Sequence, residues 1–344
     1  MIAHSIEFFN VAELRDGVLY RFPLSVCDAL QVPEYDANGK FLRIYTGHRA
    51  SARALYGAEL RFVTEAKRLA FCMEADGPVS LTAYNGDYQN AYYVAAPGKT
   101  EWNLERHAAV EGVKREAESR FSSKVWRISL SGDCNIRFIG ICTEGNAEIR
   151  PPRADEEPRF RLLAYGSSIS QGIGAPYSPL NYLNTAAQLL GIDILNKALA
   201  GGCFCEKETI DYLCGESFDA AYLEPGTNIA DRPAEIIEER VGGLISAFCT
   251  RFPDKTIFIA TPIRGLSDVS ATASDYRENY AKTRHVICSE AKKYANTVLL
   301  DGHQILKNPY YLSADILHPS DFGHVRMGFD FAAMLAPHLN VTLK

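Results

Sequence analysis

The chain changes pattern near residue 159, and the pattern from there to the C-terminus is the feature that most limits the fold. Five short apolar runs alternate there with longer segments of helical periodicity. The runs lie at 160–165, 192–197, 218–223, 256–260 and 297–300, and the main helical segments at 182–190, 233–252, 275–294 and 325–335. Strands separated by helices pair in parallel, and helices cover both faces of a parallel sheet. Residues 159–344 are therefore predicted to form an α/β domain with a five-stranded parallel sheet between two helical layers.

Residues 1–150 carry a different pattern, in which apolar and polar residues alternate with a period of two. Such alternation is typical of antiparallel strands that bury one face. The predicted strands are 18–22, 41–45, 58–63, 68–73, 79–84, 125–130 and 136–141. Short strands with turns between them favour an all-β sandwich of the jelly-roll kind. We expect this accessory domain to be joined to the α/β domain by the proline-rich linker 151–158.

The composition narrows the classes of partner and location. The formal charge of −6 argues against a nucleic-acid partner. No apolar run reaches the ~18 residues of a membrane span, so no membrane partner is expected. The first residues lack a signal-peptide pattern, and the nine cysteines are irregularly spaced. We therefore expect a cytoplasmic protein with reduced thiols. Its oligomeric state stays open, with a homo-oligomer among the outcomes.

A candidate nucleophile follows the first strand of the predicted parallel sheet. That strand ends at Gly166, and the two serines Ser167 and Ser168 come directly after it. Ligands bind at the carboxyl ends of strands in an open α/β sheet, so this turn can present a hydroxyl to a substrate. A serine becomes a nucleophile only when a base takes its proton. From these residues alone, Ser168 is either a nucleophile or a structural turn serine.

A candidate base follows the last predicted strand, where Asp315 and His318 lie three residues apart. A turn there can bring the carboxylate to Nδ1 of the imidazole and leave Nε2 facing a substrate. The plainer interpretation is a capping aspartate and a surface histidine. Asp321 and His324 are also close in sequence, but the spacing matches no metal-ligand pattern. No metal site is predicted.

Two more loops can donate hydrogen bonds to a substrate. Gly201 follows the second predicted strand, and a glycine lets a backbone N–H approach a ligand closely. Asn228 follows the third, and its side-chain amide can donate to a developing oxyanion. Each loop alone is an ordinary strand-to-helix turn. Together with Ser168 and His318, however, they all fall at the carboxyl edge of one predicted sheet.

Four segments of the chain together resemble the four blocks of the SGNH, or GDSL-type, hydrolases. They are Gly166–Ile169, Gly201, Gly226–Asn228 and Asp315–His318, and the resemblance covers about residues 160–335. It implies a flavodoxin-like, three-layer α/β fold. It also implies a serine esterase that needs neither a metal nor an organic cofactor.

The resemblance implies a role for each candidate residue. Ser168 is the nucleophile, His318 the base and Asp315 the residue that orients the base. The oxyanion hole consists of the backbone N–H groups of Ser168 and Gly201 and the side chain of Asn228.

The chain departs from the family pattern at three positions. Ser167 stands where the family usually has an aspartate, Ile229 where another usually follows the asparagine, and Ala198 where a glycine is often found. None of these changes removes a proposed catalytic group. Ile229 does remove a polar tether for its loop.

The expected reaction is hydrolysis of a small-molecule ester through an acyl-enzyme. A β-sandwich ahead of an SGNH domain also resembles certain carbohydrate esterases. The aromatic residues Tyr84, Tyr88, Tyr92, Tyr93 and Trp102 could stack on sugars, although core and strand aromatics are the plainer interpretation. We therefore expect short-chain, chiefly acetyl, esters of saccharides as substrates. The alternatives are a lipase or thioesterase for longer acyl chains, and a non-catalytic glycan-binding protein on the same fold.

Overall fold

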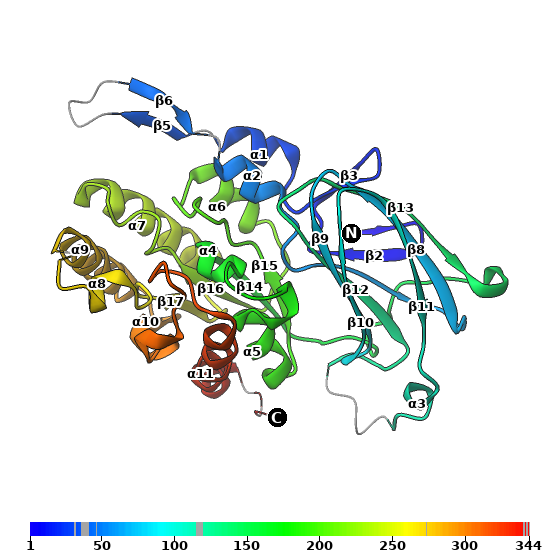
Figure 1. Ribbon diagram of the computed structural model, residues 1–344. Coiled ribbons are helices and arrows are strands. Elements are labelled where there is room, and N and C mark those ends of the chain that lie inside the picture. Colours follow the sequence, from blue (N-terminus) through cyan, green and yellow to red (C-terminus); the bar gives the residue numbers. More distant parts are fainter. Residues whose placement is uncertain are drawn as a thin grey trace.

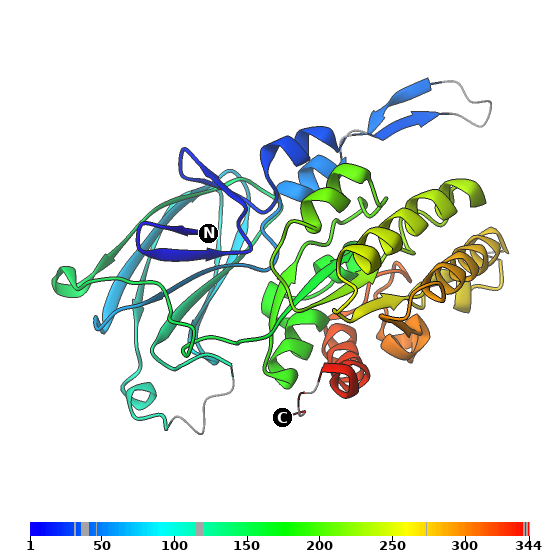
Figure 2. The ribbon, with the colours of Figure 1, turned by 180° about the vertical axis from the view of Figure 1, so that it is seen from behind.

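The computed structural model describes residues 1–344 except 31, 36–40, 46, 115–119, 273, 340, 342 and 344. An antiparallel β domain lies beside an α/β domain, and the two pack along one side (Figure 1). The view from behind shows that the N-terminus lies in the β domain and the C-terminus beneath the α/β domain (Figure 2).

Two antiparallel sheets form the N-terminal part. One has, in spatial order, β1 (Ile2–Ala3), β2 (Ile6–Phe9), β7 (Ala58–Val63), β12 (Val125–Ser131), β9 (Val79–Asn85) and β10 (Tyr88–Ala95). The other has β11 (Gly98–Glu105), β8 (Arg68–Ala75), β13 (Ile136–Thr143), β4 (Val18–Tyr20) and β3 (Glu13–Arg15). Side chains from both sheets share one apolar core, in which Leu60, Phe71 and Trp126 are fully buried. The predicted all-β sandwich is confirmed.

The chain leaves this sandwich between residues 21 and 54. It forms α1 (Leu24–Ala29), the hairpin of β5 (Val32–Tyr35) and β6 (Phe41–Tyr45), and α2 (Gly47–Arg53). Phe22, Cys27 and Ala52 are buried in the same apolar core as Leu213 of the α/β domain. The two helices are not among the predicted elements, and neither is the short α3 (Ala108–Glu111).

The C-terminal sheet is entirely parallel. In spatial order it contains β15 (Asp193–Asn196), β14 (Arg161–Gly166), β16 (Ala220–Glu224), β17 (Ile257–Ala260) and β18 (Thr297–Leu300). The first two strands are exchanged relative to their order in the chain, which is the flavodoxin-like arrangement. The five-stranded parallel sheet predicted from the sequence is confirmed.

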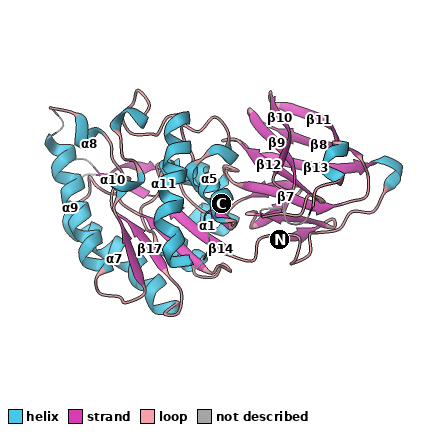
Figure 3. Ribbon diagram, turned by 90° about the horizontal axis from the view of Figure 1, so that it is seen from below, coloured by secondary structure: helices cyan, strands magenta, loops and turns pink. Residues whose placement is uncertain are grey.

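Helices cover both faces of this sheet (Figure 3). Successive strand residues point to opposite faces, so Leu163 packs on one side and Leu162 on the other. The side of Leu163 is covered by α6 (Lys207–Leu213), α7 (Ala234–Arg251) and α9 (Ser274–Ala291), and the side of Leu162 by α5 (Tyr182–Leu190) and α11 (Asp321–Leu339). The short helices are α4 (Ser168–Gln171), α8 (Leu266–Val269) and α10 (Gly302–Ile305). No helix in the described ranges is long and apolar enough to cross a membrane.

Buried polar contacts join the two parts of the chain. Arg61 of β7 binds both carboxylate oxygens of Asp193 in β15, at 2.6 and 2.9 Å. The backbone oxygen of Asn196 accepts from Arg21 at 3.0 Å and from Asn10 at 2.8 Å. The segment 151–158 is itself held, because Arg150 forms two hydrogen bonds with Glu156. The domain limits at 150 and 159 stay predictions.

Candidate active site

The turn after β14 places Ser168 at the carboxyl edge of the sheet. Ser167 has an extended backbone and caps α4, because its side chain accepts from the N–H of Ile169 at 3.3 Å. Ser168 is the first residue of that helix, and only 7% of its surface is exposed. The start of α4 therefore fixes the backbone of Ser168, and its side chain has limited contact with water.

The structure brings the hydroxyl of Ser168 together with Asp315 and His318. Nε2 of His318 lies 2.8 Å from Oγ of Ser168, and Nδ1 lies 2.6 Å from Oδ2 of Asp315. The intervening Ile316 has a φ of +55°, a conformation that a β-branched residue rarely adopts. This strained turn reverses the chain so that two side chains three residues apart can meet.

The carboxylate of Asp315 is held from several directions. Its Oδ1 atom accepts from the backbone N–H groups of Leu317 and His318, both at 3.0 Å, and from the hydroxyl of Ser313 at 3.1 Å. Partial burial alone would raise the pKa of Asp315. The hydrogen bonds from the side chain and backbone of His318 outweigh that effect and hold the pKa well below its usual range. Asp315 is therefore ionised at neutral pH and orients the Nδ1–H group of the imidazole.

The loops of Gly201 and Asn228 are tied to each other and to the serine turn. The backbone N–H of Cys203 donates to Oδ1 of Asn228 at 3.1 Å, which leaves Nδ2 as the donor of that side chain. Gly201 adopts a φ of +64°, which suits a glycine. The N–H of Leu199 donates to the oxygen of Gly166 at 2.8 Å. The two predicted oxyanion loops thus share one hydrogen-bonded framework with Ser168.

The N-terminal part supports this framework through Gln171. The Oε1 atom of Gln171 accepts from the N–H of Ala200 at 2.9 Å, from the hydroxyl of Ser51 at 2.8 Å and from Arg21 at 3.3 Å. Ser51 and Arg21 belong to the segment that leaves the sandwich. The loop of Gly201 is therefore braced by both parts of the chain.

Glu224, at the end of β16, is a buried residue beside the site and is not among the residues predicted from the sequence. Its Oε2 atom accepts from the N–H and the hydroxyl of Ser167, at 2.8 and 2.7 Å, and from the hydroxyl of Ser170 at 3.0 Å. Oε1 accepts from Thr227 at 2.9 Å. Glu224 therefore links the serine turn to the loop that carries Asn228. Its signal in the sequence is a carboxylate at the end of a run that is otherwise apolar.

Burial raises the pKa of Glu224, because the side chain is fully enclosed and the hydrogen bonds to it only partly compensate. The acidic group that the family usually places just before the nucleophile is absent here, since that position is Ser167. In this chain the hydroxyl of Ser167 reaches a carboxylate on the neighbouring strand instead.

The aromatic residues of β9 to β11 divide into two groups. Trp102 belongs to the core and stacks on Phe71, with ring centroids 5.8 Å apart. Tyr84 is also largely enclosed, whereas Tyr88, Tyr92 and Tyr93 are 36–40% exposed. Trp102 and Tyr84 thus fit the interpretation as core and strand aromatics. Tyr88, Tyr92 and Tyr93 remain on the surface.

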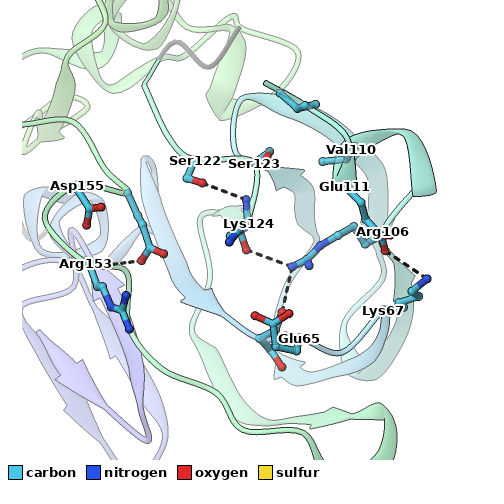
Figure 4. Close-up of a pocket in the computed structure, with 13 residues that line it drawn as sticks. Glu65, Lys67, Arg106, Val110, Glu111, Ser122, Ser123, Lys124, Arg153 and Asp155 are labelled. Carbon is cyan, nitrogen blue, oxygen red and sulfur yellow. Dashed lines mark hydrogen bonds and ion pairs between the residues drawn. The ribbon is translucent and has the colours of Figure 1, made fainter. Parts of the chain in front are cut away.

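Two hollows of the structure, one in the β domain and one between the two parts of the chain, are not lined by any candidate catalytic or oxyanion residue. A charged cavity of about 640 Å³ opens in the β domain, and Ser168, His318 and Asn228 do not line it (Figure 4). A groove of about 410 Å³ lies between the two parts of the chain. In the described part of the chain, no cluster of three or more His, Cys, Asp or Glu side chains is placed to hold a metal ion.

The fold and the site together define an α/β protein with a serine, a histidine and an aspartate in hydrogen-bonded series, the arrangement that serine hydrolases use. The sequence model of the GDSL-like lipase/acylhydrolase family matches residues 160–336, more than half of the chain. The chain belongs to this family. No curated protein sequence matches it.

Several solved structures share the fold over most or nearly all of the chain. Salicylyl-acyltransferase SsfX3 from a tetracycline biosynthetic pathway is 19% identical, with a TM-score of 0.73, and the match covers 97% of this chain and 96% of that one. An acetyl xylan esterase from the rumen bacterium Butyrivibrio proteoclasticus is 12% identical, with a TM-score of 0.57 and coverage of 98% and 96%. A family two carbohydrate esterase from Clostridium thermocellum, in complex with cellohexaose, is 13% identical, with a TM-score of 0.59 and coverage of 83% and 94%. Each of the three matches extends over parts of both the β domain and the α/β domain of this chain.

Proposed function

We propose that the chain is a serine esterase that hydrolyses short-chain, chiefly acetyl, esters of saccharides. The observation that carries the proposal is the hydrogen-bonded series from Asp315 through His318 to the hydroxyl of Ser168. An imidazole with one nitrogen on a carboxylate and the other on a serine hydroxyl is placed to take the proton of that hydroxyl.

The proposed mechanism has two halves, acylation of Ser168 and hydrolysis of the acyl-enzyme, and His318 transfers a proton in both. His318 takes the proton of Ser168 as Oγ attacks the ester carbonyl, and then gives that proton to the departing alcohol oxygen. The backbone N–H groups of Ser168 and Gly201 and the Nδ2 group of Asn228 donate to the oxyanion. His318 then takes a proton from a water molecule as the water attacks the acyl-enzyme, and returns that proton to Oγ of Ser168 as the bond between Oγ and the acyl carbon breaks and the acid is released. Asp315 keeps the imidazole oriented and stabilises its charged form.

The preference for acetyl esters of saccharides rests on two observations. Two of the structures with a similar fold are described as a carbohydrate esterase and an acetyl xylan esterase. The exposed Tyr92 of β10 lies against Tyr177 of the α/β domain, with ring centroids 4.7 Å apart. A series of nitrophenyl esters tests the acyl part. We expect kcat/KM to fall steeply beyond acetate, whereas a preference for octanoate or longer chains would support a lipase or thioesterase instead.

Acyl transfer is a second candidate, because a structure that matches almost the whole chain is described as an acyltransferase. In that case an alcohol, instead of water, takes the acyl group from Ser168. Adding a saccharide acceptor to the nitrophenyl acetate assay separates the two. Formation of acetylated saccharide faster than acetate would favour the transferase.

Replacing Asn228 by alanine is expected to lower kcat for nitrophenyl acetate on the order of 10²–10³-fold, because one oxyanion donor is lost. KM should change little, since the oxyanion exists only after attack. Asn103→Ala, on the exposed face of β11, is the matched control. A higher KM with unchanged kcat would place Asn228 in substrate binding instead.

The raised pKa of Glu224 predicts how its replacement depends on pH. The folded state holds the proton more tightly than the unfolded chain, so this stabilising effect is present below the ordinary pKa and is lost as pH rises through the raised one. Glu224→Gln keeps an oxygen for Ser167 but cannot ionise. We expect its free energy of unfolding, relative to the natural chain, to increase from pH 4 to pH 8 in urea titrations. If the difference in unfolding free energy between the variant and the natural chain does not change with pH, the raised pKa of Glu224 is contradicted.

A further inference from the structure

The groove between the two parts of the chain has walls from both of them. Tyr56, Tyr92 and Asp133 come from the N-terminal part, and Tyr177 and Ser178 come from the segment that follows α4. This segment is anchored across the seam, because the hydroxyl of Ser178 accepts from the N–H of Gly57 at 3.0 Å. The groove exists only because the β domain packs against the α/β domain.

Residues 175–178 line the groove, and the segment that carries them passes beside His318 at Gly174, although Ser168 and His318 do not themselves line the groove. The N–H of Ile173 donates to the oxygen of Ser168 at 3.0 Å, so the segment starts at the candidate nucleophile. At Gly174, whose φ is +99°, a Cβ atom would lie 2.1 Å from the oxygen of Pro319 and 3.6 Å from Cβ of His318. Only a glycine allows this contact. Three residues further along is Tyr177, which a chain can place at most about 11 Å away.

The side on which the groove lies decides which part of an ester it can take. In acyl transfer, the departing alcohol oxygen receives its proton from Nε2 of the histidine, so the alcohol part lies on the histidine side. Because Gly174 packs on His318 and Pro319, the segment that lines the groove leaves the site on that side. The oxyanion loops of Gly201 and Asn228 follow other strands. The groove is thus placed for the alcohol part and not for the acyl part.

The lining matches a molecule with apolar faces and many hydroxyl groups. The rings of Tyr92 and Tyr177 lie 4.7 Å apart, and Tyr92 is 40% exposed. Aromatic faces of this kind pack on apolar C–H surfaces. Tyr56 donates to a carboxylate oxygen of Asp133 at 3.2 Å, and the other carboxylate lone pairs can accept from hydroxyl groups. The Asp133 carboxylate disfavours an anionic ligand. The lining also contains apolar side chains such as Val94 and Pro176, which suit the C–H faces of a sugar ring.

We propose that this interdomain groove binds the alcohol part of the substrate as a saccharide of two or more units, with a sugar ring against Tyr92 and Tyr177. The inference rests on the proposed function, because it places an ester at Ser168. It also gives the β domain a function, because that domain supplies one wall of the saccharide site.

Chain length and side-chain truncation test the groove together. The substrates are mono-acetylated xylo-, cello- and manno-oligosaccharides of one to four units, with nitrophenyl acetate as the reference. We expect kcat/KM to rise at least tenfold from one to four units in at least one series. Tyr92→Ala and Tyr177→Ala should each lower the ratio of kcat/KM for that tetrasaccharide to kcat/KM for nitrophenyl acetate by about tenfold. Tyr88→Ala, on the same strand but outside the groove, should keep the ratio.

Two results would overturn the proposal. One is a kcat/KM that does not increase with chain length in any of the three series. The other is a ratio that Tyr92→Ala and Tyr177→Ala leave unchanged. If Tyr92→Ala instead lowers kcat/KM for nitrophenyl octanoate alone, the groove holds the acyl part and the assignment is wrong.

A binding measurement separates this inference from the proposed function. The full-length Ser168→Ala variant is titrated with the unacetylated tetrasaccharide of each series in a calorimeter. We expect binding that weakens at least tenfold when Tyr92→Ala is added. If the variant binds in this way but the natural chain has no esterase activity, the proposed function is wrong and the saccharide site in the groove is supported. If the natural chain has esterase activity but the variant binds no tetrasaccharide, the saccharide site is wrong and the proposed function is supported.

Discussion

Replacing Ser168 by alanine is expected to lower kcat for nitrophenyl acetate by a factor on the order of 10⁴–10⁶, the loss seen when the nucleophile of a triad is removed. The substitution removes only the hydroxyl group, whose oxygen lies 2.8 Å from Nε2 of His318. Without it, His318 and the oxyanion donors can act only on water. Initial rates at saturating ester measure the effect.

Two measurements keep this result specific to the nucleophile. Ser246→Ala, in the middle of α7, is a matched serine truncation and should retain the natural rate. A serine-reactive phosphonate should add to Ser168 in the natural chain, as a tryptic peptide mass would detect. Natural activity in Ser168→Ala, or labelling at another residue, would show that the nucleophile is elsewhere. Absence of both esterase activity and phosphonate labelling in the natural chain would instead support the non-catalytic glycan-binding alternative.

Much of the α/β domain could be predicted because its signals are local. The runs at 162–165 and 257–260 are apolar on both faces, as buried parallel strands must be. The strand-to-helix turns then place Ser168, Gly201 and Asn228 at one sheet edge without any knowledge of side-chain contacts. The pairing of Asp315 with His318 also follows from a local turn, although the strained φ of Ile316 has no evident signal in the sequence.

The missed elements of the β domain have weak patterns for a physical reason. β10 and β11 are edge strands, and most of β10 is exposed. An edge strand therefore carries little of the apolar alternation on which the prediction depends. β1 is only two residues long. The helices α1 and α2 were missed because their apolar residues bury against a core that is distant in sequence.

Glu224 and Gln171 could not be assigned from the sequence because their partners come from other strands and segments. The carboxylate of Glu224 meets Ser167 only after β14 and β16 pair in parallel. Gln171 meets Ser51 only after the segment 21–54 docks on the α/β domain. Residues that act through such contacts are visible only when the sheet register and the domain interface are known.

The largest expected effect on stability comes from Asp193. This carboxylate holds the buried guanidinium of Arg61 through two hydrogen bonds, at 2.6 and 2.9 Å. Arg61 is 1% exposed and also lies over the ring of Phe9, with 3.6 Å from the guanidinium carbon to the ring centroid. Asp193→Asn leaves that cation buried with one carboxylate partner fewer. Removing one member of a buried pair costs about 3–5 kcal/mol of unfolding free energy.

The measurement uses the positions of the tryptophans. Both of them, Trp102 and Trp126, lie in the core of the β domain, so their fluorescence follows that part, while helical circular dichroism follows mainly the α/β domain. Because Arg61 and Asp193 lie on opposite sides of the interface, we expect Asp193→Asn to lower the urea midpoint by both probes. Glu74→Gln, which breaks an exposed pair with Arg137, should change the unfolding free energy by less than about 1 kcal/mol.

A double variant distinguishes an unpaired charge from simple loss of packing. Arg61→Met combined with Asp193→Leu removes both charges and keeps apolar volume in the interface, so it should be less destabilising than Asp193→Asn alone. Glu59 then keeps Arg127, with which it forms hydrogen bonds of 2.6 and 3.0 Å. If the double variant is the less stable of the two, the attraction itself stabilises the interface. If Asp193→Asn shifts neither probe, the pair does not hold the two parts of the chain together.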